Sequence, residues 1–194
     1  MAARGARVTG VDFSASSIAH AAAAARAAGV EADFRTADYL HDDLPAGQDL
    51  AVLIYGDYCA LSPQRRARLL ARVRGVLRPG GALVFDVFSI GAFDALTEVE
   101  ECGRCYMAGF WAPGDYFGFR RTFLYAERKV GLDRYLIAAP ERIFTVDNWM
   151  QYFAPENAVA EARAAGFSRI ETVDALTGGA WTPGADPFAV VARA

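Results

Sequence analysis

Asp12 is the residue of this 194-residue chain whose type and position best suit binding chemistry. It ends a short stretch, residues 7–12, that predicts a buried β-strand, and an alanine-rich segment follows it. An acidic residue at the end of a strand in a nucleotide-binding sheet accepts hydrogen bonds from the two hydroxyls of a ribose. An Asp just before a helix also caps that helix. Asp12 alone therefore leaves a ribose-binding role and a capping role open.

Strand and helix patterns alternate along the first 90 positions. We expect strands at residues 7–12, 31–36, 49–55 and 82–88, with helices near residues 15–28 and 62–78. The apolar run DLAVLIY is typical of a strand covered on both faces of a parallel sheet. This order predicts a doubly wound, mostly parallel α/β sheet, in which ligands bind beyond the carboxyl ends of the strands. The residues that follow those ends are Asp12, Phe13, Asp38, Tyr39, Gly56, Asp57, Tyr58 and Ser89.

The sequence changes character after residue 89. Strand-like segments at 117–125, 129–138 and 142–146 lie within a stretch, about 102–146, that reads as an inserted antiparallel β segment. A helix at 155–165 and strands at 167–173 and 187–192 then resume the α/β pattern. Because about 45 residues are too few for a good core of their own, we expect one domain over residues 1–194, with the insertion packed on the main sheet.

Composition and charge exclude several classes of protein. A net charge of −3 gives no broad positive field for nucleic acid, and charged residues interrupt every apolar run too soon for a membrane span or a signal peptide. Three cysteines fit a reducing compartment, so we expect a cytoplasmic protein. The pair Cys102 and Cys105 lacks two further ligands at zinc-site spacing, and we predict no metal.

Four segments together resemble the class I S-adenosylmethionine-dependent methyltransferases of the small-molecule type. They are VTGVDFS at 8–14, ADY at 37–39, LRPGG at 77–81 before a buried strand, and WMQYF at 149–153 before a helix that closes in AGF. The resemblance covers nearly the whole chain and is weakest in the 102–146 insertion. It implies a Rossmann-like fold and S-adenosylmethionine as the cofactor.

The resemblance also implies roles for individual residues. Asp12 would hold the cofactor ribose and Phe13 would pack on the adenine, while Asp38, with Tyr39 beside it, would accept the adenine amino group. Tyr55 and Gly56 would line the reacting centre, where Asp57 and Tyr58 are the candidate catalytic residues and His41 is a candidate by placement only. Aromatic residues of the second half would wall a pocket for a small-molecule acceptor or form core; the candidates for the pocket are Trp111, Trp149, Tyr152 and Phe153.

One departure from the family pattern is large. No strand and glycine-rich turn precede Asp12, although in the family's strand order that strand is central, between the strands ending at Asp12 and Tyr55. Both neighbours would then lose ladder partners, and we expect a chain truncated at its N-terminus.

Two alternatives to a methyltransferase stay open. One is a Rossmann-type NAD(P)-dependent oxidoreductase, against which the LRPGG turn and the lack of a Tyr-x-x-x-Lys pair in a helix argue. The other is a non-catalytic remnant or dimerisation module. A homodimer is an open expectation for the oligomeric state.

Overall fold

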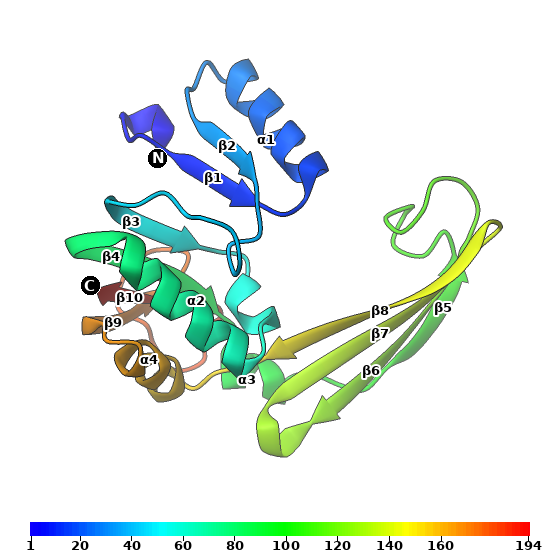
Figure 1. Cartoon of the computed structure of the whole chain (residues 1–194). Helices are drawn as coiled ribbons and strands as arrows, with labels where there is room; N and C mark the ends of the chain where they lie inside the picture. Colours follow the sequence, from blue (N-terminus) through cyan, green and yellow to red (C-terminus); the bar gives the residue numbers. More distant parts are fainter.

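A computed structural model describes residues 1–194 and contains three sheets that share no strand pairing (Figure 1). The first is the parallel pair β1 and β2, the second is a mixed sheet in the order β3-β4-β10-β9, and the third is antiparallel in the order β5-β6-β7-β8. The bounds of the first two sheets are β1 Thr9–Asp12, β2 Asp33–Thr36, β3 Gln48–Leu53, β4 Leu77–Val87, β9 Ser168–Asp174 and β10 Phe188–Arg193.

The mixed sheet carries the main core. Strand β3 runs parallel to β4, whereas β10 runs antiparallel to both β4 and β9. Helices α2 (Pro63–Val76) and α4 (Pro155–Ala164) contact this sheet, and Arg74 Nε on α2 donates to the carbonyl of Gly166, just beyond α4, at 2.8 Å. Ser62 caps α2 and Pro63 takes its first position, as the sequence predicts.

The pair β1 and β2 stands apart from the mixed sheet and is covered by α1 (Ala15–Ala27). The facing edges of β1 and β3 pair with no other strand, which confirms the expected loss of ladder partners. A mainly apolar cavity of about 380 Å³ lies between these edges. On the β3 side, Leu50, Val52 and Ile54 are 38%, 42% and 53% exposed, although their run of apolar neighbours suits a buried strand.

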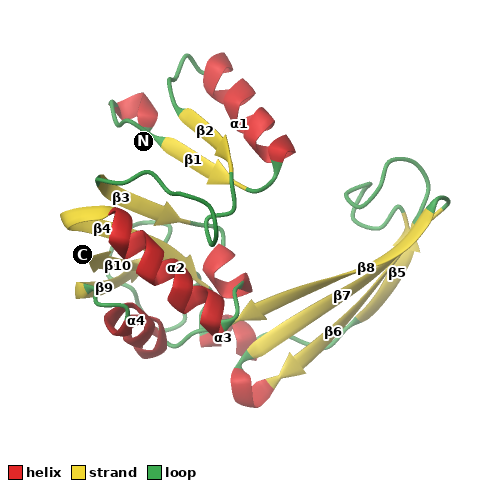
Figure 2. Cartoon of the chain, viewed as in Figure 1, coloured by secondary structure: helices red, strands yellow, loops and turns green.

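The third sheet is a projecting arm made of β5 (Glu100–Arg104), β6 (Phe117–Tyr125), β7 (Val130–Ala139) and β8 (Arg142–Gln151). Our expectation that this insertion packs on the main sheet is wrong, because the arm extends away from it (Figure 2). The base of β8 contacts the 3-10 helix η2 (Asp57–Ala60), and a short helix α3 (Ile90–Asp94) precedes the arm. The arm has a small core of its own, formed by Tyr116, Tyr135 and Ile137.

The structure contains no helix that is both long enough and apolar enough to cross a membrane.

Candidate functional site at the carboxyl ends of the strands

Asp12 lies where β1 turns into α1, and its carboxylate is only partly engaged. Oδ1 accepts the backbone N–H of Ser14 at 2.7 Å, while the Ser14 hydroxyl caps the helix by accepting from the Ser17 N–H at 3.2 Å. Ser14 therefore performs the capping, and Oδ2 of Asp12 accepts no hydrogen bond within the protein. Phe13 follows with its ring 79% exposed. A carboxylate oxygen and an aromatic face are therefore both accessible beside the end of β1.

Asp38 follows β2 in a turn that keeps its carboxylate charged. Oδ1 accepts the backbone N–H of Leu40 at 2.8 Å, and Oδ2 lies 2.7 Å from Nδ1 of His41. The hydrogen bond with His41, followed by the one from Leu40, holds the pKa of Asp38 below its usual value. His41 thus acts on Asp38, and no contact places it at the reacting edge as a base.

Tyr39 joins the turn after β2 to the turn after β3. Its hydroxyl donates to Oδ2 of Asp57 at 3.1 Å. Burial is the main cause that raises the Tyr39 pKa, and the negative charges of Asp57, Asp38 and Asp12 raise it further. Tyr39 therefore connects directly to one of the carboxylates that the sequence predicts at the strand ends, that of Asp57.

The turn after β3 is fixed by Asp86, a residue that the sequence analysis did not single out. The backbone N–H groups of Tyr55 and Gly56 donate to its two carboxylate oxygens, each at 2.9 Å. Both residues have φ of 70°, and a Cβ added to Gly56 would lie 2.5 Å from the Phe88 ring. Only glycine fits the second position without strain. The signal that could have found Asp86 is a lone carboxylate in the apolar run ALVFDVF.

Tyr58 points into the core instead of toward this edge. It is 1% exposed, and its hydroxyl donates to Oε2 of Glu161 at 2.6 Å. Burial and that hydrogen bond raise its pKa above the usual value. The buried guanidinium of Arg66 donates to both oxygens of Glu161 at 2.8 Å and lies 5.1 Å from the centre of the Phe153 ring. Tyr58 and Phe153 thus belong to a buried ionic cluster, to which Arg66 and Glu161 are unpredicted contributors.

The remaining predicted aromatics lie in different places. Trp149 on β8 is 44% exposed at the base of the arm. Tyr152 is half-buried and packs against Phe93 at 5.4 Å between ring centres, and burial raises its pKa. Trp111 packs 4.7 Å from Tyr135 in the arm's own small core, so the structure does not bring it to the strand ends.

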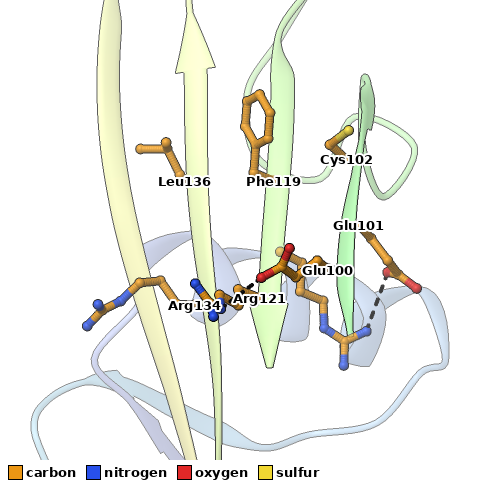
Figure 3. A pocket seen from close by; sticks show the side chains of 8 residues that line it. Glu100, Glu101, Cys102, Phe119, Arg121, Arg134 and Leu136 are labelled. Atoms are coloured by element: carbon orange, nitrogen blue, oxygen red, sulfur yellow. Dashed lines mark ion pairs between the residues drawn. The ribbon is translucent and has the colours of Figure 1, made fainter. Parts of the chain in front are cut away.

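Two cavities border the arm. One of about 840 Å³ lies between η2, the start of α2 and the base of β6 and β8. The other, of about 530 Å³, lies farther out on the arm, and Figure 3 shows its ion pairs. These join Arg121 to Glu100 at 3.0 Å and Arg120 to Glu101 at 3.7 Å. No group of three or more His, Cys, Asp or Glu side chains in the structure could hold a metal ion.

Comparisons with known proteins concern the first 81 residues and the fold of the chain. Residues 1–81 match the family model of a methyltransferase domain, and no curated protein matches the chain. An S-adenosylmethionine-dependent methyltransferase from Clostridium acetobutylicum ATCC 824 aligns at a TM-score of 0.73 with 12% identity, over 99% of this chain and 76% of that one. The CcbJ methyltransferase from Streptomyces caelestis aligns at 0.74 with 15% identity, over 100% and 76%.

A third solved structure, SAM-bound CalS10 from Micromonospora echinaspora, is described as an amino pentose methyltransferase. It aligns at a TM-score of 0.56 with 19% identity, over 96% of this chain and 73% of that one. The predicted Rossmann-like fold, of the kind found in these methyltransferases, is confirmed. Nothing in the comparisons supports the oxidoreductase alternative.

Proposed function

Because residues 1–81 carry a methyltransferase domain and the chain has the fold of S-adenosylmethionine-dependent methyltransferases, we propose that this protein transfers a methyl group from S-adenosylmethionine to a small-molecule acceptor. The observation that carries the proposal is the position of Asp12, Asp38 and Asp57 at the carboxyl ends of β1, β2 and β3, with a hydrogen bond from Tyr39 to Asp57 joining the last two turns. The carboxyl edge of an α/β sheet is where such folds bind ligands.

The residues at this edge fit the cofactor. The free Oδ2 of Asp12 suits the ribose hydroxyls, and the exposed ring of Phe13 suits the adenine face. Asp38, held in its charged form, suits the adenine amino group. When bound, S-adenosylmethionine supplies an activated methyl group on a sulfonium.

The protein's own part in the reaction is mainly alignment. A methyl displacement gains most from holding the reacting atoms in line. Asp86 fixes the turn of Tyr55 and Gly56 through two backbone hydrogen bonds, and Asp57 begins η2 directly after that turn. Where the acceptor has a proton to lose, Asp57 is positioned to accept it, since one of its oxygens has no hydrogen-bond partner.

For the acceptor we propose a small molecule that reaches this edge beside Trp149 and Tyr152. Tyr58, Phe153 and Trp111 are not part of this proposal, because the first two lie in the core and the third in the arm.

We further propose a cytoplasmic homodimer. The three cysteines are free, as suits a reducing compartment. One face of the arm exposes Phe117, Phe119, Leu136 and Ile143, at 54%, 43%, 41% and 71%, which a second copy would cover. Light scattering at micromolar concentration tests the dimer, and a monomer mass would contradict it.

Calorimetric titration with S-adenosylhomocysteine tests the function. We expect the wild type to bind and Asp12→Asn to lose about tenfold or more in affinity, because a charged acceptor is replaced at the ribose position. Asp33→Asn is the matched control, since Asp33 lies on neighbouring β2 and pairs only with Arg35. Failure of the wild type to bind, together with an unchanged melting temperature, would instead favour a non-catalytic remnant.

A further inference from the structure

The larger cavity beside the arm has one-sided charge. Its lining includes Arg65, Arg66 and Arg128 and no carboxylate. The guanidinium of Arg66 is paired with Glu161, whereas Arg65 and Arg128 form no ion pair, although the positive charge of Arg65 contributes to lowering the pKa of Asp38. The lining therefore has two arginines without an ion pair and no carboxylate, which favours a negatively charged ligand.

The cavity farther out on the arm provides the contrast. Its three arginines, Arg120, Arg121 and Arg134, each pair with a carboxylate of the arm. Figure 3 shows the pairs of Arg120 and Arg121. An arginine of this outer cavity and an arginine of the larger cavity are therefore the same residue type, and they differ in whether a carboxylate pairs with them. Of the two cavities beside the arm, the one at its base is lined by arginines that form no ion pair.

Aromatic rings form another wall of the same cavity. Tyr125 and Trp149 lie 5.7 Å apart between ring centres, at an interplanar angle of 31°. Tyr125 and Trp149 are 43% and 44% exposed, so part of each ring is open to a ligand. Aromatic faces of this kind stack on the flat or ring-shaped part of a ligand.

The cavity also adjoins the proposed reacting edge. Cys59 and Ala60, which line it, belong to the same 3-10 helix that begins at Asp57. A ligand in the cavity can therefore extend toward the edge where the methyl group would be transferred.

We infer that the acceptor of this enzyme is an anionic ring compound, whose phosphate or carboxylate binds Arg65 and Arg128 and whose ring stacks on Trp149 and Tyr125. This inference rests on the proposed function and names its substrate class. Phenyl phosphate and benzoate represent the two anionic groups, phenyl β-glucoside is a neutral ring, and inorganic phosphate is an anion without a ring.

Calorimetric titration with these four probes, and with S-adenosylhomocysteine in parallel, tests the inference on the intact chain. We expect phenyl phosphate or benzoate to bind more tightly than either phenyl β-glucoside or inorganic phosphate, and added salt to weaken the binding. The double variant Arg65→Gln/Arg128→Gln should lose about tenfold or more of that affinity, because hydrogen bonds to charged groups disappear. Arg121→Gln, at the paired cavity, is the matched control and should bind as the wild type does.

The outcomes separate the two proposals. Binding of S-adenosylhomocysteine without binding of either anionic ring probe would overturn the acceptor class and leave the proposed function standing. An unchanged affinity in the double variant, or equal binding of the neutral ring, would overturn the role of the arginines. Equal binding of inorganic phosphate, unaffected by Trp149→Ala, would overturn the role of the aromatic wall. The single variant Arg128→Gln provides the same comparison if the double variant does not fold.

Discussion

Replacing Glu161 with glutamine should destabilise the protein far more than its position on a helix suggests. Glu161 accepts three hydrogen bonds, two from Arg66 at 2.8 Å and one from the Tyr58 hydroxyl at 2.6 Å. The Arg66 side chain is 4% exposed, so its charge is poorly solvated when the carboxylate is lost. Breaking a buried ion pair by removing one partner costs about 3–5 kcal/mol.

The structure lowers that range for this pair. Glu161 is itself 30% exposed, so water reaches the site, and Arg66 keeps its bond from Nη1 to the Leu61 carbonyl at 2.6 Å. We therefore expect Glu161→Gln to lower the free energy of unfolding by about 2–3 kcal/mol. At about 2–4 °C per kcal/mol for a chain of this size, the melting temperature should fall by about 4–12 °C.

Calorimetric or circular-dichroism melting checks this value. Glu171→Gln is the matched control, because Glu171 on β9 is exposed and has no side-chain hydrogen bond, and it should change stability by less than about 0.5 kcal/mol. The double variant Arg66→Met/Glu161→Gln should recover part of the loss, since no unpaired charge stays buried. A loss below about 0.5 kcal/mol in Glu161→Gln would refute the assignment of a buried, mutually dependent pair.

Three further outcomes follow from the structure. Gly56→Ala should lower the free energy of unfolding by about 1–3 kcal/mol and weaken S-adenosylhomocysteine binding, because φ is 70° and the new Cβ would meet Phe88. The control Gly75→Ala, in open space on α2, should not destabilise the protein, and equal melting temperatures of the two variants would contradict this. Nuclear magnetic resonance titration should give Asp38 a pKa below its usual 3.8, and this pKa should rise in His41→Ala. The stability that Asp38 contributes is present above the unfolded pKa and is lost as the pH falls through the lower folded pKa. An unshifted pKa in both proteins would contradict the role of His41. Hydrogen exchange should be fast for the β3 amides that face the cavity beside β1 and slow in β4 and β10, and uniform protection across β3 would mean that its edge is paired.

The position of Asp12, Asp38 and Asp57 at the carboxyl ends of three strands could be predicted from the sequence, because the apolar runs indicate where each strand ends. That the Tyr58 side chain points into the core could not be predicted from the sequence. Asp57 begins a 3-10 helix, which rotates the next side chain toward the core, and no periodicity in DYCA distinguishes that turn from a loop. The role of Asp86 could in principle have been predicted, since a carboxylate within a buried strand needs hydrogen-bond donors. Here the backbone amides of Tyr55 and Gly56 supply them.

The arm shows a different limit. Three of its four strands were predicted, and β6 and β7 begin and end close to the expected positions, whereas β5 was not predicted and β8 continues to Gln151. Its direction did not follow, because strand patterns fix pairing within a sheet and contain no information on the angle at which a sheet leaves the body. Trp111 was assigned to the acceptor pocket on the assumption that the insertion folds over the main sheet, and it lies instead beside Tyr135.

The two halves of the proposed cofactor edge are held together by a loop, since no strand pairing joins β1 to β3. Leu40 of this loop is 5% exposed in the main core, and Arg72 of α2 donates from Nε to the Tyr39 carbonyl at 2.9 Å. The Tyr39 hydroxyl then reaches Asp57. Asp57 is thus fixed by η2 and Asp38 by the anchored loop, whereas Asp12 depends on a two-stranded unit with an unpaired edge. Pairs of strands are marginal on their own, so the ribose position is the part of the edge whose geometry is held least firmly.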